Sequence, residues 1–68
     1  MKLGKYLKEN NYTQMSFIKE LEDKNNISIP QGTLAKWVLG TRIPRKDQML
    51  LLYEFTQGSV GPNDFYFN

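Results

Sequence analysis

The chain has 68 residues, a formal net charge of +2, and neither cysteine nor histidine. A chain of this length forms one small domain that buries only about 60% of its unfolded surface, so a partner subunit would add to a marginal core. The missing cysteines exclude disulfides and thiolate metal sites, and the missing histidines remove the commonest general base and metal ligand. No catalytic constellation is present either, so we expect a binding protein rather than an enzyme, with no metal and no cofactor.

The N-terminal residues contain no long apolar run. A signal peptide needs an apolar stretch of roughly 7–15 residues, and a membrane helix needs about 20. We therefore expect no membrane association and a soluble protein of the cytoplasm.

The charged residues are unevenly distributed along the chain. Residues 24–46 contain five basic side chains and no acidic one, whereas Glu20, Glu22 and Asp23 form an acidic cluster directly before this segment. A basic segment in a small domain suits a polyanion such as nucleic acid. The plain alternative is an ordinary solvated surface.

Two helices are predicted in the first part of the chain. Residues 2–10 place three apolar side chains on one face, namely Leu3, Tyr6 and Leu7, although the interior Gly4 costs about 1 kcal/mol against alanine. Thr13 is a good N-cap for a second helix over residues 13–24. The apolar side chains of this second helix are expected in the core, with Met15 filling a gap beside Phe17, Ile18 and Leu21. In the connection that follows, Ile27 and Ile29 are expected to hold the turn against the core.

A third helix is predicted over residues 30–39. Pro30 suits a first helical turn, and Gly40 suits the left-handed position that ends a helix. Leu34, Trp37 and Val38 fall on one apolar stripe, which assigns the tryptophan to the core. Gln31, Thr33 and Lys36 fall off this stripe and are expected to face outward, as in a recognition helix.

A fourth helix is predicted over residues 45–56, followed by a short fifth helical turn over residues 63–67. The continuous apolar run of residues 49–53 indicates burial on more than one side of the fourth helix, and Gly58 is its expected C-cap. Three aromatic residues lie near the end of the sequence, namely Phe65, Tyr66 and Phe67. Three consecutive aromatic side chains are too apolar to remain exposed to water. They are therefore expected to pack on the fourth helix or to contact a partner subunit.

Several short motifs in this order resemble the Cro and C1-type phage repressor family. They are Thr13-Gln14, Ile18, Ile29, Gln31 with Leu34 and Trp37, and the segment from Gly40 to Pro44. The ending Thr56, Gly58, Val60 and Asp64-Phe65 is similar to the small Cro-like, YdaS-like branch. The resemblance implies an all-α, compact, four- to five-helix, lambda-repressor-like helix-turn-helix domain. More residues separate Thr13 from Ile29 than in the family, so residues 22–27 are expected to lengthen the second helix or the turn.

The resemblance also implies roles for individual residues. Base contacts are expected from Gln31, Gly32, Thr33 and Lys36. Phosphate contacts are expected from Thr13, Gln14, Thr41, Arg42, Arg45 and Lys46. Glutamine can hydrogen-bond an adenine edge, and glycine lets the helix backbone come close to DNA. The alternative for Gln31 and Thr33 is that they are ordinary polar residues in a first helical turn.

The resulting hypothesis is a sequence-specific transcriptional regulator that binds a double-stranded DNA operator. A Cro-like repressor of a bacterium or a phage-infected host cell is implied, as a homodimer on a palindromic site. The alternative is an antitoxin-like accessory regulator or a protein-interaction module. In that case a protein partner would contact the acidic residues 20–23 and the aromatic C-terminal segment.

Overall fold

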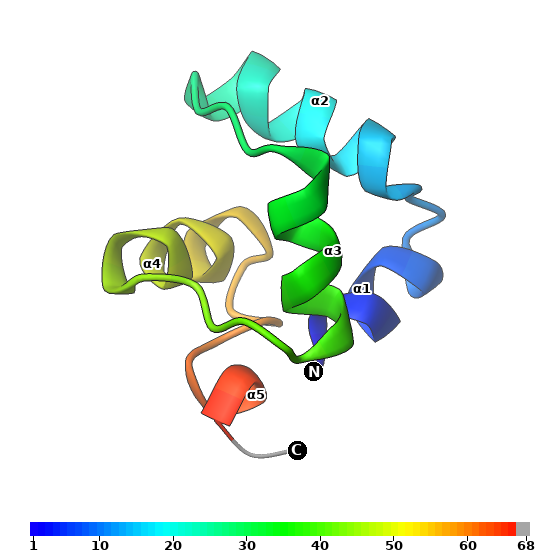
Figure 1. Ribbon diagram of the computed structural model, residues 1–68. Helices are drawn as coiled ribbons and strands as arrows, with labels where there is room; N and C mark the ends of the chain where they lie inside the picture. The colour runs from blue at the N-terminus through cyan, green and yellow to red at the C-terminus, as the bar shows by residue number, and fades with distance from the viewer. Residues whose placement is uncertain (67–68) are drawn as a thin grey trace.

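The computed structural model describes residues 1–66, and within them the chain forms five α-helices and no strand. The helices are α1 (Leu3–Glu9), α2 (Gln14–Asn25), α3 (Gln31–Leu39), α4 (Lys46–Phe55) and α5 (Asn63–Tyr66). Figure 1 shows α3 in the middle of the molecule, with α2 across its N-terminal end and α4 beside it. The predicted all-α, five-helix fold is confirmed. None of these helices has the length and apolar character to cross a lipid bilayer.

One core joins all five helices and two of their connections. Its buried apolar side chains are Leu3, Leu7, Phe17, Leu21, Ile29, Leu34, Trp37, Met49, Leu52, Val60 and Phe65. Trp37 lies in this core as predicted, and α3 packs against both α1 and α2. The rings of Phe17 and Phe55 meet edge to face with centroids 5.3 Å apart, which links α2 to α4.

The glycine in α1 has a packing reason. A Cβ atom built on Gly4 would lie 3.2 Å from Cγ1 of Val38 on α3, which is tighter than ordinary side-chain contact. The absence of a side chain at Gly4 therefore lets α1 approach α3 closely. The same absence weakens α1 as an isolated helix.

A capping box begins α2 as the predicted N-cap requires. Thr13 Oγ1 accepts from the Ser16 N–H at 3.0 Å, and Ser16 Oγ accepts from the Thr13 N–H at 2.9 Å. The helix ends at Asn25, and Asn26 follows in the left-handed region with φ 58°. Met15 does not fill a gap in the core: its side chain is 58% exposed, because Phe17 and Leu21 occupy the inward side of α2.

The extra residues before α3 are divided between helix and turn. Residues 22–25 extend α2, and residues 26–30 form the connection. Ile29 is buried and holds this connection to the core, but Ile27 is exposed and does not. Pro30 precedes α3 as its N-cap residue, in an extended conformation, rather than forming part of the first turn.

The predicted burial of α4 on more than one side is wrong for its outer side, although the half-buried Leu51 packs against the core together with Met49 and Leu52. Met49 and Leu52 face the core, whereas Leu50 and Tyr53 are exposed. The reason is that α4 lies at the outside of the helix arrangement, so one of its sides has no neighbour (Figure 1). The expected C-cap is also shifted: Thr56 caps α4, and the left-handed residues Gln57 and Gly58 follow it.

The C-terminal segment folds back onto the first residues of the chain. Phe65 is buried, Tyr66 is exposed, and Phe67 lies outside the described residues. The Asp64 carboxylate accepts from the Gly61 N–H at 2.8 Å and lies 3.1 Å from the Met1 ammonium group. Burial acts to raise the pKa of Asp64, but these two contacts and the nearby Lys2 outweigh it and hold the pKa below its ordinary value.

Candidate nucleic-acid interface

The helix α3 presents a polar face opposite its buried stripe. Leu34 and Trp37 point into the core, and Gln31, Gly32 and Lys36 lie on the other side of the helix. Gln31, Gly32 and Lys36 are exposed, whereas Thr33 is half-buried at the border between the two faces. The four predicted base-contacting residues therefore lie on one helix surface, with Thr33 at its edge.

Gly32 has no packing reason within the described part of the chain. A Cβ atom built on it would meet no atom within 4 Å, in contrast to the tight contact found at Gly4. A glycine in a helix costs up to about 1 kcal/mol against alanine, so this position gives up helix stability for no internal contact. Its missing side chain leaves the backbone at the start of α3 open to a close approach from outside.

A depression of about 370 Å³ lies where the connection before α3 meets the connection after it. Three predicted contact residues line it, namely Thr33, Arg42 and Arg45. The remaining lining residues are Ser28, Ile29, Pro30, Ile43 and Gln48. The fold thus brings two arginines and two hydroxyl-bearing residues to the border of one depression, and these residue types suit an anionic oxygen.

The end of α3 holds the basic loop in place. The Lys36 carbonyl accepts from the Thr41 N–H at 3.0 Å and from the Thr41 hydroxyl at 3.4 Å. Gly40 adopts φ 82°, which turns the chain back over the helix end. Pro44 is buried, so the loop is fastened at both of its ends. The Thr41 hydroxyl is therefore directed at the helix end, and the Arg42 side chain extends from an anchored backbone.

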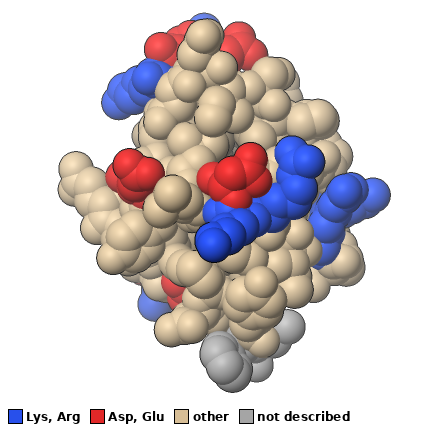
Figure 2. Space-filling view, turned by 90° about the vertical axis from the view of Figure 1, so that its left-hand side faces the viewer, with Lys and Arg blue, Asp and Glu red and all other residues tan. Residues whose placement is uncertain are grey.

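Arg45 stands at the start of α4. Its backbone N–H donates to Gln48 Oε1 at 2.9 Å, and its Nε lies 4.0 Å from Asp47 Oδ1. Both side chains of this ion pair are highly exposed, so the carboxylate offsets only a small part of the positive charge. Figure 2, which views the molecule from the side of α4, shows basic side chains gathered together with an acidic group against them.

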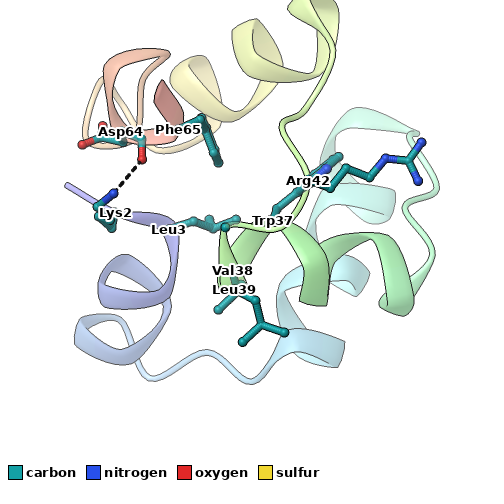
Figure 3. Close-up of a pocket in the computed structure, with 9 residues that line it drawn as sticks. Lys2, Leu3, Trp37, Val38, Leu39, Arg42, Asp64 and Phe65 are labelled. Carbon is teal, nitrogen blue, oxygen red and sulfur yellow. Dashed lines mark hydrogen bonds between the residues drawn. The ribbon is translucent and has the colours of Figure 1, made fainter. Parts of the chain in front are cut away.

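A small second pocket of about 90 Å³ lies between α1, the end of α3 and α5. Lys2 donates from Nζ to the Asp64 carbonyl at 3.4 Å on one side of it. Figure 3 shows the guanidinium of Arg42 pointing away from Lys2 and Asp64. Arg42 thus lines both this pocket and the depression beside Thr33, with its charged end directed away from Lys2 and Asp64.

The other predicted phosphate contacts lie apart from the depression. The Thr13 hydroxyl is engaged in the cap of α2, where its oxygen accepts from Ser16, although its hydrogen remains available to a further acceptor. Gln14 is half-buried in the first turn of α2, and Lys46 lines a different, apolar groove on α4. Ser28 and Gln48 were not predicted, because no local pattern marks a residue that long-range packing brings to a site.

The fold and these side chains define a small all-helical domain with one polar, basic face. In the described part of the chain, no three acidic groups lie close enough together to hold a metal ion. No protein-family model, curated protein or solved structure matches the chain. The resemblance to the Cro and C1-type repressors therefore stays a prediction that rests on the residue pattern.

Proposed function

We propose that the chain is a sequence-specific transcriptional regulator of the Cro-like repressor type that binds double-stranded DNA. In this proposal α3 enters the major groove, and Gln31 and Lys36 hydrogen-bond base edges there. Thr33 contacts a base or the adjoining phosphate from the border of the same face. The acids Glu22 and Asp23 belong to α2 and lie outside this set of contacts.

The observation that supports the proposal most is the exposed Gly32. A side chain there would meet nothing within the described part of the chain, so no internal contact explains the glycine. A helix that lies in the major groove, which is about 12 Å wide, gains from a backbone that can approach the bases closely. Gly32 stands between Gln31 and Thr33, at the end of the helix where base contacts concentrate.

Arg42 and Arg45 supply the phosphate contacts in this proposal. Both line the depression that Thr33 also lines, next to the N-terminal end of α3. A guanidinium group can bind two phosphate oxygens at once, which fixes the register of the helix on the duplex. Each neutralised phosphate steepens the fall of log K with log salt by roughly one unit.

The first experiment is selection of bound sequences from a random pool of double-stranded DNA. We expect an enriched sequence, which then serves as the probe for variants. Lys36→Glu combined with Arg42→Glu should weaken binding by at least roughly 100-fold at low salt and flatten the salt dependence. Lys8→Glu with Lys19→Glu is the matched control, because it makes the same charge change on exposed positions of α1 and α2. Unchanged binding by the α3 variant, or equal loss in the control, would contradict the proposed interface.

The alternative is a protein-interaction module that uses the acidic residues 20–23 and the aromatic C-terminal residues. Fewer of these side chains are free to contact a partner than the sequence indicates. Glu20 pairs with Lys24 at 3.2 Å, and Phe65 is buried in the core. Glu22, Asp23 and Tyr66 remain exposed. A random-pool selection that enriches no sequence would favour this alternative.

A further inference from the structure

An apolar groove of about 300 Å³ lies on the outer side of α4. Its lining residues are Lys46, Met49, Leu50, Tyr53 and Pro62. Leu50 is 58% exposed and Tyr53 is 48% exposed, although both belong to the most apolar segment of the chain. Figure 2 shows uncharged surface beside the charged group on this side of the molecule. Neighbouring apolar side chains that stay exposed in this way favour an interaction site on this side of α4.

The Tyr53 ring is held in place by the loop that follows α4. A Cβ atom on Gly61 would lie 3.3 Å from Tyr53 Cδ1, and one on Gly58 would lie 3.6 Å from Tyr53 Cζ. The ring therefore rests on glycine backbone on one side and faces outward on the other. An aromatic ring that is already fixed loses little conformational freedom on binding, which suits an interface anchor.

The charges at the two ends of this surface are complementary to each other. Lys46 and Glu54 stand four residues before and four residues after Leu50, so the three side chains lie in one row along the helix. Both charged residues are exposed, and neither forms an ion pair within residues 1–66. A partner for this face needs an apolar middle, a negative group opposite Lys46 and a positive group opposite Glu54.

We propose that a second copy of this chain supplies that partner, with the two α4 helices antiparallel about a two-fold axis at Leu50. An antiparallel pair centred on Leu50 places each Lys46 opposite the Glu54 of the other copy. The two Leu50 side chains meet at the axis, and Tyr53 of each copy covers the apolar surface beside it. Such an interface is self-complementary, as two-fold symmetry requires. It gives Lys46 an acidic partner in place of a phosphate.

This dimer supplies a second copy of α3 for the second half-site of a palindromic operator. In that respect the inference rests on the proposed function. Association is measured without DNA, however, so its failure and a failure of DNA binding are separate results. The face on α4 and the polar face of α3 carry different residues, which allows each to be changed alone. A variant that loses the dimer and still binds a single half-site would separate the two roles.

The first experiment is sedimentation equilibrium of the full chain without DNA. We expect reversible dimerisation in the wild type and a monomer for Leu50→Lys. Lys46→Glu and Glu54→Lys should each weaken dimerisation by about tenfold, because each places like charges together twice per dimer. The double variant Lys46→Glu with Glu54→Lys should return to within about threefold of the wild type. Lys8→Glu and Glu22→Lys are the single-charge controls, since both positions are exposed on other helices.

The second experiment tests the register directly. The chain has no cysteine, so one introduced cysteine is unique. Leu50→Cys should form a disulfide-linked dimer rapidly under mild oxidation, because the two-fold axis brings its two copies together. Met15→Cys is the matched control, since Met15 has the same 58% exposure as Leu50 but lies on α2.

Four results would overturn the proposal. The first is a wild-type protein that stays monomeric up to about 1 mM. The second is a dimer that Leu50→Lys leaves intact while circular dichroism shows both proteins folded. The third is a charge-swapped double variant that dimerises no better than the single variants. The fourth is disulfide cross-linking that is equally fast in the Leu50→Cys and Met15→Cys variants.

Discussion

The Thr56 hydroxyl accepts a hydrogen bond from the Val60 N–H at 3.0 Å and thereby ties the end of α4 to the following loop. The same hydroxyl donates to the Leu52 carbonyl at 2.7 Å. Within residues 1–66, Thr56 is the only buried polar residue, and Val60, which it contacts, is fully buried. One side chain therefore satisfies two backbone groups that have no access to water.

Replacing Thr56 by valine should destabilise the fold by roughly 1–3 kcal/mol. The valine has a similar shape, but it leaves the buried Val60 N–H without an acceptor, and that desolvation cost is what the variant measures. Thr56→Ser is the control, because it keeps the hydroxyl and removes only a methyl group. Urea unfolding of the three proteins checks the prediction. A serine variant less stable than the valine variant would show that packing matters more than the hydrogen bonds.

Gly4 and Val38 should be energetically coupled. Gly4→Ala improves helix propensity by up to about 1 kcal/mol, but its methyl group lies 3.2 Å from a valine side chain that has little rotamer freedom in a helix. We expect little or no gain in the wild type and a clear gain in the Val38→Ala background. The double-mutant cycle should give a coupling energy of about 0.5–1 kcal/mol. Additive effects would mean that α1 can move away from α3 at no cost.

Gly32→Ala should separate stability from DNA binding. The new methyl group meets no atom within 4 Å in the described chain, so the variant should be more stable by up to about 1 kcal/mol. On DNA the same methyl group would stand between the helix backbone and the bases, and affinity for the selected sequence should fall about tenfold or more. Thermal unfolding and a binding titration on the same preparation measure the two effects. A variant that is stabilised and binds unchanged would remove the main support for placing α3 in the major groove.

Local patterns predict the helices of this chain well, because the interactions that begin and end them are local. Thr13 caps α2 through a residue three positions away, and Gly40 ends α3 through its own left-handed backbone. The positions of Leu34 and Trp37 in the core follow from helical spacing alone. These features need no knowledge of how the helices pack.

The missed features depend on which helix faces have neighbours. Leu50 is as apolar as the buried Leu52 beside it, and only the position of α4 at the outside of the fold exposes Leu50 and Tyr53. Met15 is exposed for the same kind of reason. The depression beside Thr33 likewise needs three segments to meet, so Gln48 could not be assigned to it from sequence spacing.

The Asp64 carboxylate should make stability fall in acid. Its pKa is held below the ordinary value in the folded protein, while in the unfolded chain the group titrates at about 3.9. Above that unfolded value its stabilising contribution is fully present. As the pH falls through the unfolded value toward the lower folded pKa, the unfolded state takes up a proton first, and the contribution is lost.

Asp64→Asn tests this relationship. At neutral pH the variant should be less stable than the wild type, because the Met1 ammonium and the Gly61 N–H lose a charged acceptor. The difference between the two unfolding free energies should shrink steadily as the pH is lowered from about 5 to about 2. Asp23→Asn, at an exposed position on α2, corrects for the general effect of removing one carboxylate. A difference between wild type and Asp64→Asn that stays constant with pH would mean that the folded state does not favour the ionised carboxylate.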